Sequence, residues 1–227
     1  MKDRGSNIVA RRTVLGLLAV GTVSMLAGCG LFNSHAAYRF RMTVEAQTPQ
    51  GVARATSVSE VRAEKNNFKI LAEERAGGSG VFGEAVVLEM PNGPVFVLMK
   101  VPPERESLQR VITQALKPGV PLGGAVNFFP AVQSLGGWFS GTVKAELSRS
   151  DWPIMVRFRD LNDPKSIERV DPDAIGVKRI EIETTSDDMT TGIEGRLPWL
   201  SEAKQFHYNG TAYGDLYPLP VSDFKKP

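Results

Sequence analysis

The acidic stretch 160–173 holds the densest set of potential metal ligands in the sequence. Asp160, Asn162 and Asp163 offer several oxygen atoms, which are the ligands that hard cations such as Ca²⁺ prefer. Their spacing lacks the alternating acids, central glycine and terminal glutamate of an EF-hand loop. Asp163 and Asp171 each precede a proline, which is typical of a short helical turn capped by the aspartate. We therefore expect a structural connection with two capped turns, and a cation site is the alternative.

Histidine-dependent catalysis has weak support in this sequence. The chain has 2 histidines, of which His35 falls in an expected tether and His207 is typical of a strand residue with a hydrogen-bonded ring. No Gly-x-Ser-x-Gly motif is present, and two histidines without a further ligand cluster do not indicate zinc. Hydrolysis by a pair of dispersed carboxylates, as in glycoside hydrolases, is an alternative, because the two acids need not be close in sequence. We expect no cofactor and no metal.

A second candidate feature lies in the stretch 189–199, where Arg196 and Trp199 could form a polar and aromatic recognition surface. The alternative, which we favour, is a turn followed by a strand that packs its tryptophan. Together with the stretch 157–172, this segment resembles a family of uncharacterised bacterial proteins, and the resemblance implies no activity. The possible polar site therefore consists of Asp160, Asn162, Asp163 and Arg196.

The N-terminal residues have the layout of a signal peptide. Residues 1–13 are basic, and residues 14–27 contain no charged side chain. Fourteen helical residues reach only about 21 Å, short of the ~30 Å hydrocarbon core of a bilayer. A removable leader is therefore favoured over a permanent transmembrane helix.

The leader ends in Leu26-Ala27-Gly28-Cys29, which resembles the lipobox of bacterial lipoproteins. The resemblance implies a diacylglyceryl thioether on Cys29, cleavage before it and acylation of the new amino terminus. Two or three acyl chains give stable membrane anchoring. Cys29 is also the only cysteine, which excludes an internal disulfide. Arg11-Arg12 resembles a twin-arginine export signal, and the general secretion route is the alternative.

The charge balance of the mature chain argues against a nucleic-acid partner. Removal of residues 1–28 leaves 23 basic against 24 acidic residues, so the apparent basicity belongs mostly to the leader. The expected partners are the membrane, through the lipid, and an envelope protein. Gly30 follows the anchor where an aspartate would resemble an inner-membrane retention signal, so the outer membrane is the favoured location.

The domain plan has three parts: a cleaved signal peptide over 1–28, a lipidated tether over 29–37 and one β-rich globular domain over 38–227. Hydrophobic residues make up 42% of the chain, enough for a core. The predicted fold class is α+β and mostly β, with antiparallel hairpins forming a sheet or sandwich and one clear helix.

Two hairpins are predicted from local signals. Residues 38–46 alternate apolar and polar side chains, and a turn at 48–51 returns the chain as a second strand. Asn92-Gly93 joins strands at 84–90 and 95–101. The glycine-rich stretch 77–80 is interpreted as a flexible link.

A helix is predicted from Pro103 to a stop at 117–119. A long apolar connection is expected over 118–141, with its aromatic side chains folded over a sheet edge or, as the alternative, exposed to a partner or membrane. These aromatic residues are Phe128, Phe129, Trp138 and Phe139.

Further strands are predicted over 142–147, 154–159 and 179–183, and a last hairpin near 209–217. If the second and third of these strands pair with each other, Arg157 and Arg159 would face Glu181 and Glu183 across the sheet.

Function is expected to follow from the anchor rather than from a catalytic motif. The leading hypothesis is a membrane-anchored, non-enzymatic envelope lipoprotein that binds a partner or has a structural role. One alternative is a periplasmic hydrolase using dispersed carboxylates. Another is a tethered carrier of a small apolar ligand, with the aromatic connection lining its mouth.

Overall fold

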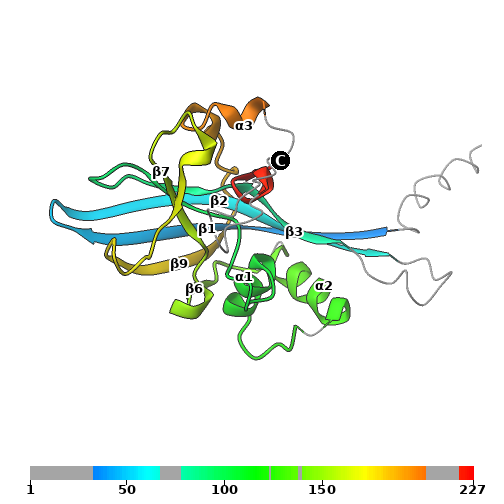
Figure 1. Cartoon of the computed structure of the whole chain (residues 1–227). Coiled ribbons are helices and arrows are strands. Elements are labelled where there is room, and N and C mark those ends of the chain that lie inside the picture. The colour runs from blue at the N-terminus through cyan, green and yellow to red at the C-terminus, as the bar shows by residue number, and fades with distance from the viewer. Residues whose placement is uncertain (1–32, 67–77, 123, 138–139, 203–219) are drawn as a thin grey trace, which may run out of the picture.

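The computed structural model describes residues 33–66, 78–122, 124–137, 140–202 and 220–227 (Figure 1). The described chain forms two antiparallel sheets with helices packed against them, which confirms the predicted fold class. Cys29, Trp138, Phe139, His207 and the expected hairpin near 209–217 lie outside the described residues.

The larger sheet is built on one long hairpin that runs through the whole molecule (Figure 1). The expected first hairpin is confirmed, but its first strand begins at Asn33 rather than at residue 38, so that 33–37 are strand. The sheet has the strand order β10-β3-β2-β1-β9-β6. Its strands are β1 (Asn33–Thr48), β2 (Gly51–Asn66), β3 (Ser79–Glu84), β6 (Lys144–Glu146), β9 (Val177–Thr185) and β10 (Lys225–Lys226).

The alternation along β1 separates a core face from an outer face. Tyr38, Phe40 and Val44 are buried, whereas Arg39 and Arg41 between them point to the opposite side of the sheet. A strand covered on one side requires this pattern, so the local sequence explains the orientation of the sheet. The stretch 77–80, expected to be a flexible link, instead contributes its last two residues to β3.

The smaller sheet has the order β4-β5-β7-β8 and comprises β4 (Val86–Leu88), β5 (Val95–Val97), β7 (Met155–Phe158) and β8 (Ile167–Arg169). Its first hairpin is the one predicted around Asn92-Gly93. The sheet is buried on both faces: Val95 and Val97 pack into the core below the large sheet, and Phe96 belongs to a second apolar cluster with Leu197 and Phe224.

The conditional pairing of strands 154–159 and 179–183 does not occur. β7 pairs with β5 and β8, whereas β9 pairs with β1 and β6. Arg157 and Arg159 therefore both form ion pairs with Glu168, and Glu183 lies beside Lys144. The physical reason is proximity, because β8 follows β7 after a short turn and closes a smaller loop than β9 would.

Two helices lie on the core side of the large sheet: α1 (Leu108–Leu116) and α2 (Gly124–Leu135) (Figure 1). α1 begins later than the predicted start at Pro103. Part of the expected long apolar connection 118–141 is a helix, with Pro130 inside it, so the prediction of a connection and of only one clear helix is wrong there. Phe128 and Phe129 are buried, as expected of aromatics covered by the domain.

Asp163 and Asp171 cap the turns that precede β8 and β9. Asp163 accepts a hydrogen bond from the Lys165 N–H at 2.9 Å, and Asp171 accepts one from the Asp173 N–H at 3.1 Å, which confirms both predicted caps. The short helix α3 (Trp199–Glu202) replaces the strand expected there. Single 3₁₀ turns cover Arg149–Asp151, Pro164–Ser166, Ile193–Gly195 and Val221–Asp223. No helix in the described ranges is both long and apolar enough to cross a membrane.

Candidate binding site on the outer face of the large sheet

The outer face of the large sheet carries a row of charged side chains. Because alternate residues of a strand share a face, Arg39, Arg41 and Glu45 of β1 lie on the side away from the core. The register places Glu60 of β2 opposite Arg39, and Arg179 of β9 opposite Glu45. Oppositely charged residues therefore face one another across three neighbouring strands.

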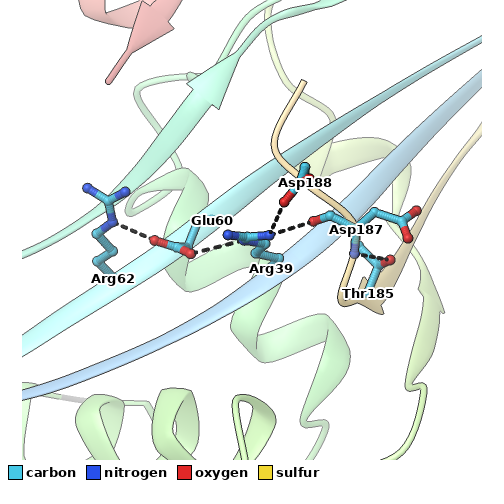
Figure 2. A network of polar contacts seen from close by, with 6 residues as sticks. All are labelled: Arg39, Glu60, Arg62, Thr185, Asp187 and Asp188. Atoms are coloured by element: carbon cyan, nitrogen blue, oxygen red, sulfur yellow. Dashed lines mark hydrogen bonds and ion pairs between the residues drawn. The ribbon is translucent and has the colours of Figure 1, made fainter. Parts of the chain in front are cut away.

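Arg39 is the centre of this row (Figure 2). Its Nε donates to Glu60 Oε2 at 3.3 Å, and its Nη1 donates to the Asp187 carbonyl at 2.9 Å and to Asp188 Oδ1 at 3.1 Å. Arg62 Nε donates to the other oxygen of Glu60 at 2.6 Å. The Glu60 carboxylate is thus held between two guanidinium groups.

Residues 186–192, which we call the crossing segment, leave the end of β9 and pass over the outer face of β1 to β2. Arg41 forms an ion pair with Asp187 near the start of the segment. At its other end, the Thr190 N–H donates to the Val58 carbonyl at 3.0 Å, and the Val58 N–H donates to Thr190 Oγ1 at 2.9 Å. Arg39 and Arg41 therefore fix the segment against the sheet.

A hollow of about 480 Å³ lies beside Arg39 and Glu60. Its other walls come from the end of β9 and from the chain after α2, including Thr142 and Thr185. The Arg39 side chain is 34% exposed, and its Nη2 has no hydrogen-bond partner among the described residues. Two guanidinium N–H groups are therefore available to a carboxylate or carbonyl oxygen of a ligand.

Two carboxylates of this face, Glu183 and Glu45, have a pKa lowered by their partners. A hydrogen bond from Lys144, together with Arg41, holds the pKa of Glu183 below its ordinary value. A hydrogen bond from Arg179 does the same for the pKa of Glu45. A general acid at neutral pH needs a raised pKa, so these groups suit ionic recognition better than proton transfer.

A carboxyl group with a raised pKa occurs elsewhere, at Asp223. Burial raises its pKa, and Lys100, whose Nζ lies 3.4 Å from Asp223 Oδ2, opposes that shift. The Asp223 carbonyl accepts a hydrogen bond from the Met99 N–H. Asp223 thus belongs to the segment that leads into β10 and not to the outer-face network.

The expected aromatic mouth for an apolar ligand does not form from Phe128 and Phe129, which are packed in the core. An internal cavity lined by Phe40, Met42 and Leu98 measures about 10 Å³, which is room for about one water molecule. The carrier hypothesis therefore gains no support from these residues.

The residues predicted as a polar site fall into two places. Asp160 Oδ1 accepts from the Asn162 N–H at 2.9 Å, and Asp163 caps the following turn, so their oxygens serve the backbone of one turn. Arg196 forms an ion pair with Glu89 at 2.6 Å. No group of three or more metal-ligating side chains is found among the described residues.

Trp199 packs rather than projecting as a recognition surface. Its Nε1 donates to the Leu161 carbonyl at 2.9 Å, and its ring makes edge contacts with Phe158 and Phe224. The favoured interpretation of a packed tryptophan is confirmed, although its element is a helix. The other residue of note, His35, is exposed on β1.

The network around Arg39 could not be predicted from the sequence. The alternation over 38–46 places Arg39 and Arg41 outward, but their partners Glu60 and Asp187 are set by strand register and by the crossing segment. Comparison of the chain with protein-family models, with curated proteins and with solved structures found no match.

Proposed function

We propose that the protein is a membrane-anchored envelope lipoprotein whose folded domain is a non-catalytic binding module. The lipobox at Cys29 supports the anchor, and Gly30 favours the outer membrane. The observation that carries the binding role is Arg39, which has an unused Nη2 beside a hollow while its neighbouring carboxylates are paired.

The hollow would recognise a polar ligand group of an envelope partner. Arg39 Nη2 offers two N–H donors in one plane, which match a carboxylate or a backbone carbonyl. The ion pairs to Glu60 and Asp188 hold the guanidinium in place before binding, which lowers the entropy lost on association.

The anchor is tested with Cys29→Ser. This variant should leave the membrane fraction and fail to incorporate a labelled fatty acid, because the thioether needs the cysteine sulfur. Gly30→Asp tests the location. On a density gradient, the wild type should be found with outer membranes and this variant with inner membranes. If Cys29→Ser stays in the membrane fraction and still incorporates the labelled fatty acid, the anchor is elsewhere.

The binding role is tested by placing a photo-crosslinking amino acid at Thr142, a wall of the hollow, in living cells. We expect a covalent adduct that disappears when Arg39→Ala is combined with the probe. Arg157→Ala is the matched control, because Arg157 is also a strand arginine paired with a glutamate but lies on the small sheet. No adduct, or an adduct that survives Arg39→Ala, would contradict the proposal.

A further inference from the structure

The backbone of β2 has a side that faces away from β1. The N–H and C=O groups of Val58 are both bonded to Thr190, and the Glu64 N–H donates to the Gly78 carbonyl at 2.8 Å. Alternate residues of a strand direct their backbone groups to the same side. The even-numbered residues of β2 therefore present their N–H and C=O groups away from β1.

Only part of this side is paired. β3 pairs with β2 from Glu60 to Ala63, and Thr190 occupies Val58. Val52, Arg54 and Thr56 have no hydrogen-bond partner on this side among the described residues, and all three are exposed. We call residues 52–56 the open edge of β2.

The open edge has apolar character at one end. Val52 is 66% exposed, the only large hydrophobic side chain so exposed in the described part of the chain. A hollow of about 540 Å³ lies between Gly51–Ala53 and the turn of the β4–β5 hairpin, with Glu89, Met90 and Pro91 on its far wall. β4 lies close to β2 and Arg54 places a charge on the edge, but the backbone groups of residues 52–56 that face away from β1 stay unpaired by any described residue, and together with the exposed valine they indicate an interaction surface.

Arg54 places a positively charged side chain on the outer side of the open edge. Arg179 makes two hydrogen bonds to the Glu45 carboxylate, at 2.7 and 3.1 Å, and Arg54 lies 3.6 Å from the same carboxylate. Two guanidinium groups thus share one negative charge. The Arg54 side chain is 58% exposed, so it can reach an acidic side chain on an added strand.

We propose that the open edge of β2 binds an extended peptide segment of an envelope protein by strand addition. The peptide backbone would pair with Val52, Arg54 and Thr56. Side chains that alternate along the peptide would place apolar residues in the hollow near Met90 and acidic residues beside Arg54. The open edge is a second surface of the proposed binding module, separate from the hollow beside Arg39, and its binding needs neither the lipid nor Arg39.

The first experiment measures hydrogen exchange of the full chain at single-residue resolution. Amide hydrogens of Val52, Arg54 and Thr56 should exchange rapidly, whereas those of Ala53 and Ala55 should be protected by their pairing with β1. Slow exchange at all five residues in the free protein would show that the edge is already covered, and would overturn the proposal.

The second experiment adds a capped synthetic peptide, Thr-Val-Glu-Val-Glu-Val-Thr, to the same protein. It should slow exchange at Val52, Arg54 and Thr56, and a peptide with lysine in place of glutamate should bind about tenfold more weakly. A peptide N-methylated along one edge should not bind, because it lacks the backbone donors.

Variants of the open edge then locate the peptide. Arg54→Glu should reverse the preference between the glutamate and lysine peptides, and Thr56→Pro should prevent binding by removing an edge N–H without affecting the β1 pairing. Unchanged binding in both variants, or no peptide effect on exchange, would overturn strand addition. Arg157→Ala, a change on the small sheet, should leave peptide binding intact. Failure to detect an adduct that depends on Arg39 would contradict the hollow alone, and failure of the wild type to bind the peptide would contradict the edge alone.

Discussion

The buried carboxylate of Glu84 accepts a hydrogen bond at 2.8 Å from the backbone N–H of Ile193, which lies 109 positions further along the chain. The other oxygen of Glu84 forms an ion pair with Lys225 of β10 at 3.1 Å. One side chain therefore joins β3, the turn before α3 and the last strand. A charge buried at this point depends on both partners.

Glu84→Ala should lower the free energy of unfolding by about 2–3 kcal/mol, because it removes an ionic hydrogen bond and an ion pair from a buried site. The free energy of unfolding of Glu84→Gln should lie between those of Glu84→Ala and the wild type, since an amide oxygen can still accept from the Ile193 N–H. Urea unfolding measures both. Glu89→Ala breaks an exposed ion pair and should cost no more than about 1 kcal/mol. An equal loss in Glu84→Ala and Glu89→Ala would contradict the role of Glu84.

Asp163→Ala should cost about 1 kcal/mol of stability, the usual loss of an N-cap side chain. Asp163→Asn retains an oxygen that can accept from the Lys165 N–H and should remain close to the wild type. Thermal unfolding with and without Ca²⁺ distinguishes the cap from a cation site. A rise in Tm with Ca²⁺ in the wild type but not in Asp163→Ala would establish the cation site instead.

Gly176→Ala should destabilise the fold more than Gly141→Ala, although both glycines have positive φ. A Cβ at Gly176 would lie 2.3 Å from the Gln47 carbonyl oxygen, whereas a Cβ at Gly141 meets no atom within 4 Å. Gly141→Ala should therefore cost about 1 kcal/mol for the left-handed backbone alone. Gly176→Ala should cost about 2–4 kcal/mol, because the β1 end must also shift. Equal losses in denaturant unfolding would show that the contact relaxes freely.

Asp223→Asn should change the pH dependence of stability. Burial raises the pKa of Asp223 above its ordinary value of 3.8, so the folded state holds the proton more tightly than the unfolded state. The contribution of protonated Asp223 to the free energy of unfolding is fully present below the ordinary pKa and is lost as the pH rises through the raised pKa. Asn carries no charge, so the variant should gain stability relative to the wild type at pH 7 and much less at pH 3.

Asp173→Asn is the matched control and has the opposite sign. A hydrogen bond from Arg149 lowers the pKa of Asp173, so its contribution is present above the ordinary value and is lost as the pH falls through the lowered pKa. This variant should lose stability at neutral pH and approach the wild type in acid. Parallel profiles for the two variants would contradict both assignments.

Local signals were sufficient for the two tight hairpins and the capped turns. Alternation over 38–46 and the Asn92-Gly93 turn act between residues that are neighbours in sequence, so they predict structure directly. The pairing of β9 with β1 does not follow from such signals. A strand pattern states which face is buried but leaves the choice of neighbour to the whole topology.

Helix α2 and the network around Arg39 were not predicted because both depend on contacts between residues far apart in the sequence. Glycines and Pro130 predict an irregular segment, yet packing of Phe128 and Val132 on the large sheet stabilises α2. Arg39 could be placed on the outer face from its neighbours alone. Its contact with Asp187 spans 148 positions and required the path of the crossing segment.

The length of β1 sets a distance between the proposed anchor and the open edge. Its 16 residues extend about 50 Å at the usual rise of a strand. The residues between Cys29 and Asn33 add at most about 14 Å of covalent reach. With Cys29 in the bilayer, the hairpin is a stiff spacer that limits how far from the lipid surface a partner strand can be engaged. Lengthening or shortening the hairpin by residue pairs would change that height without altering the face on which any side chain lies.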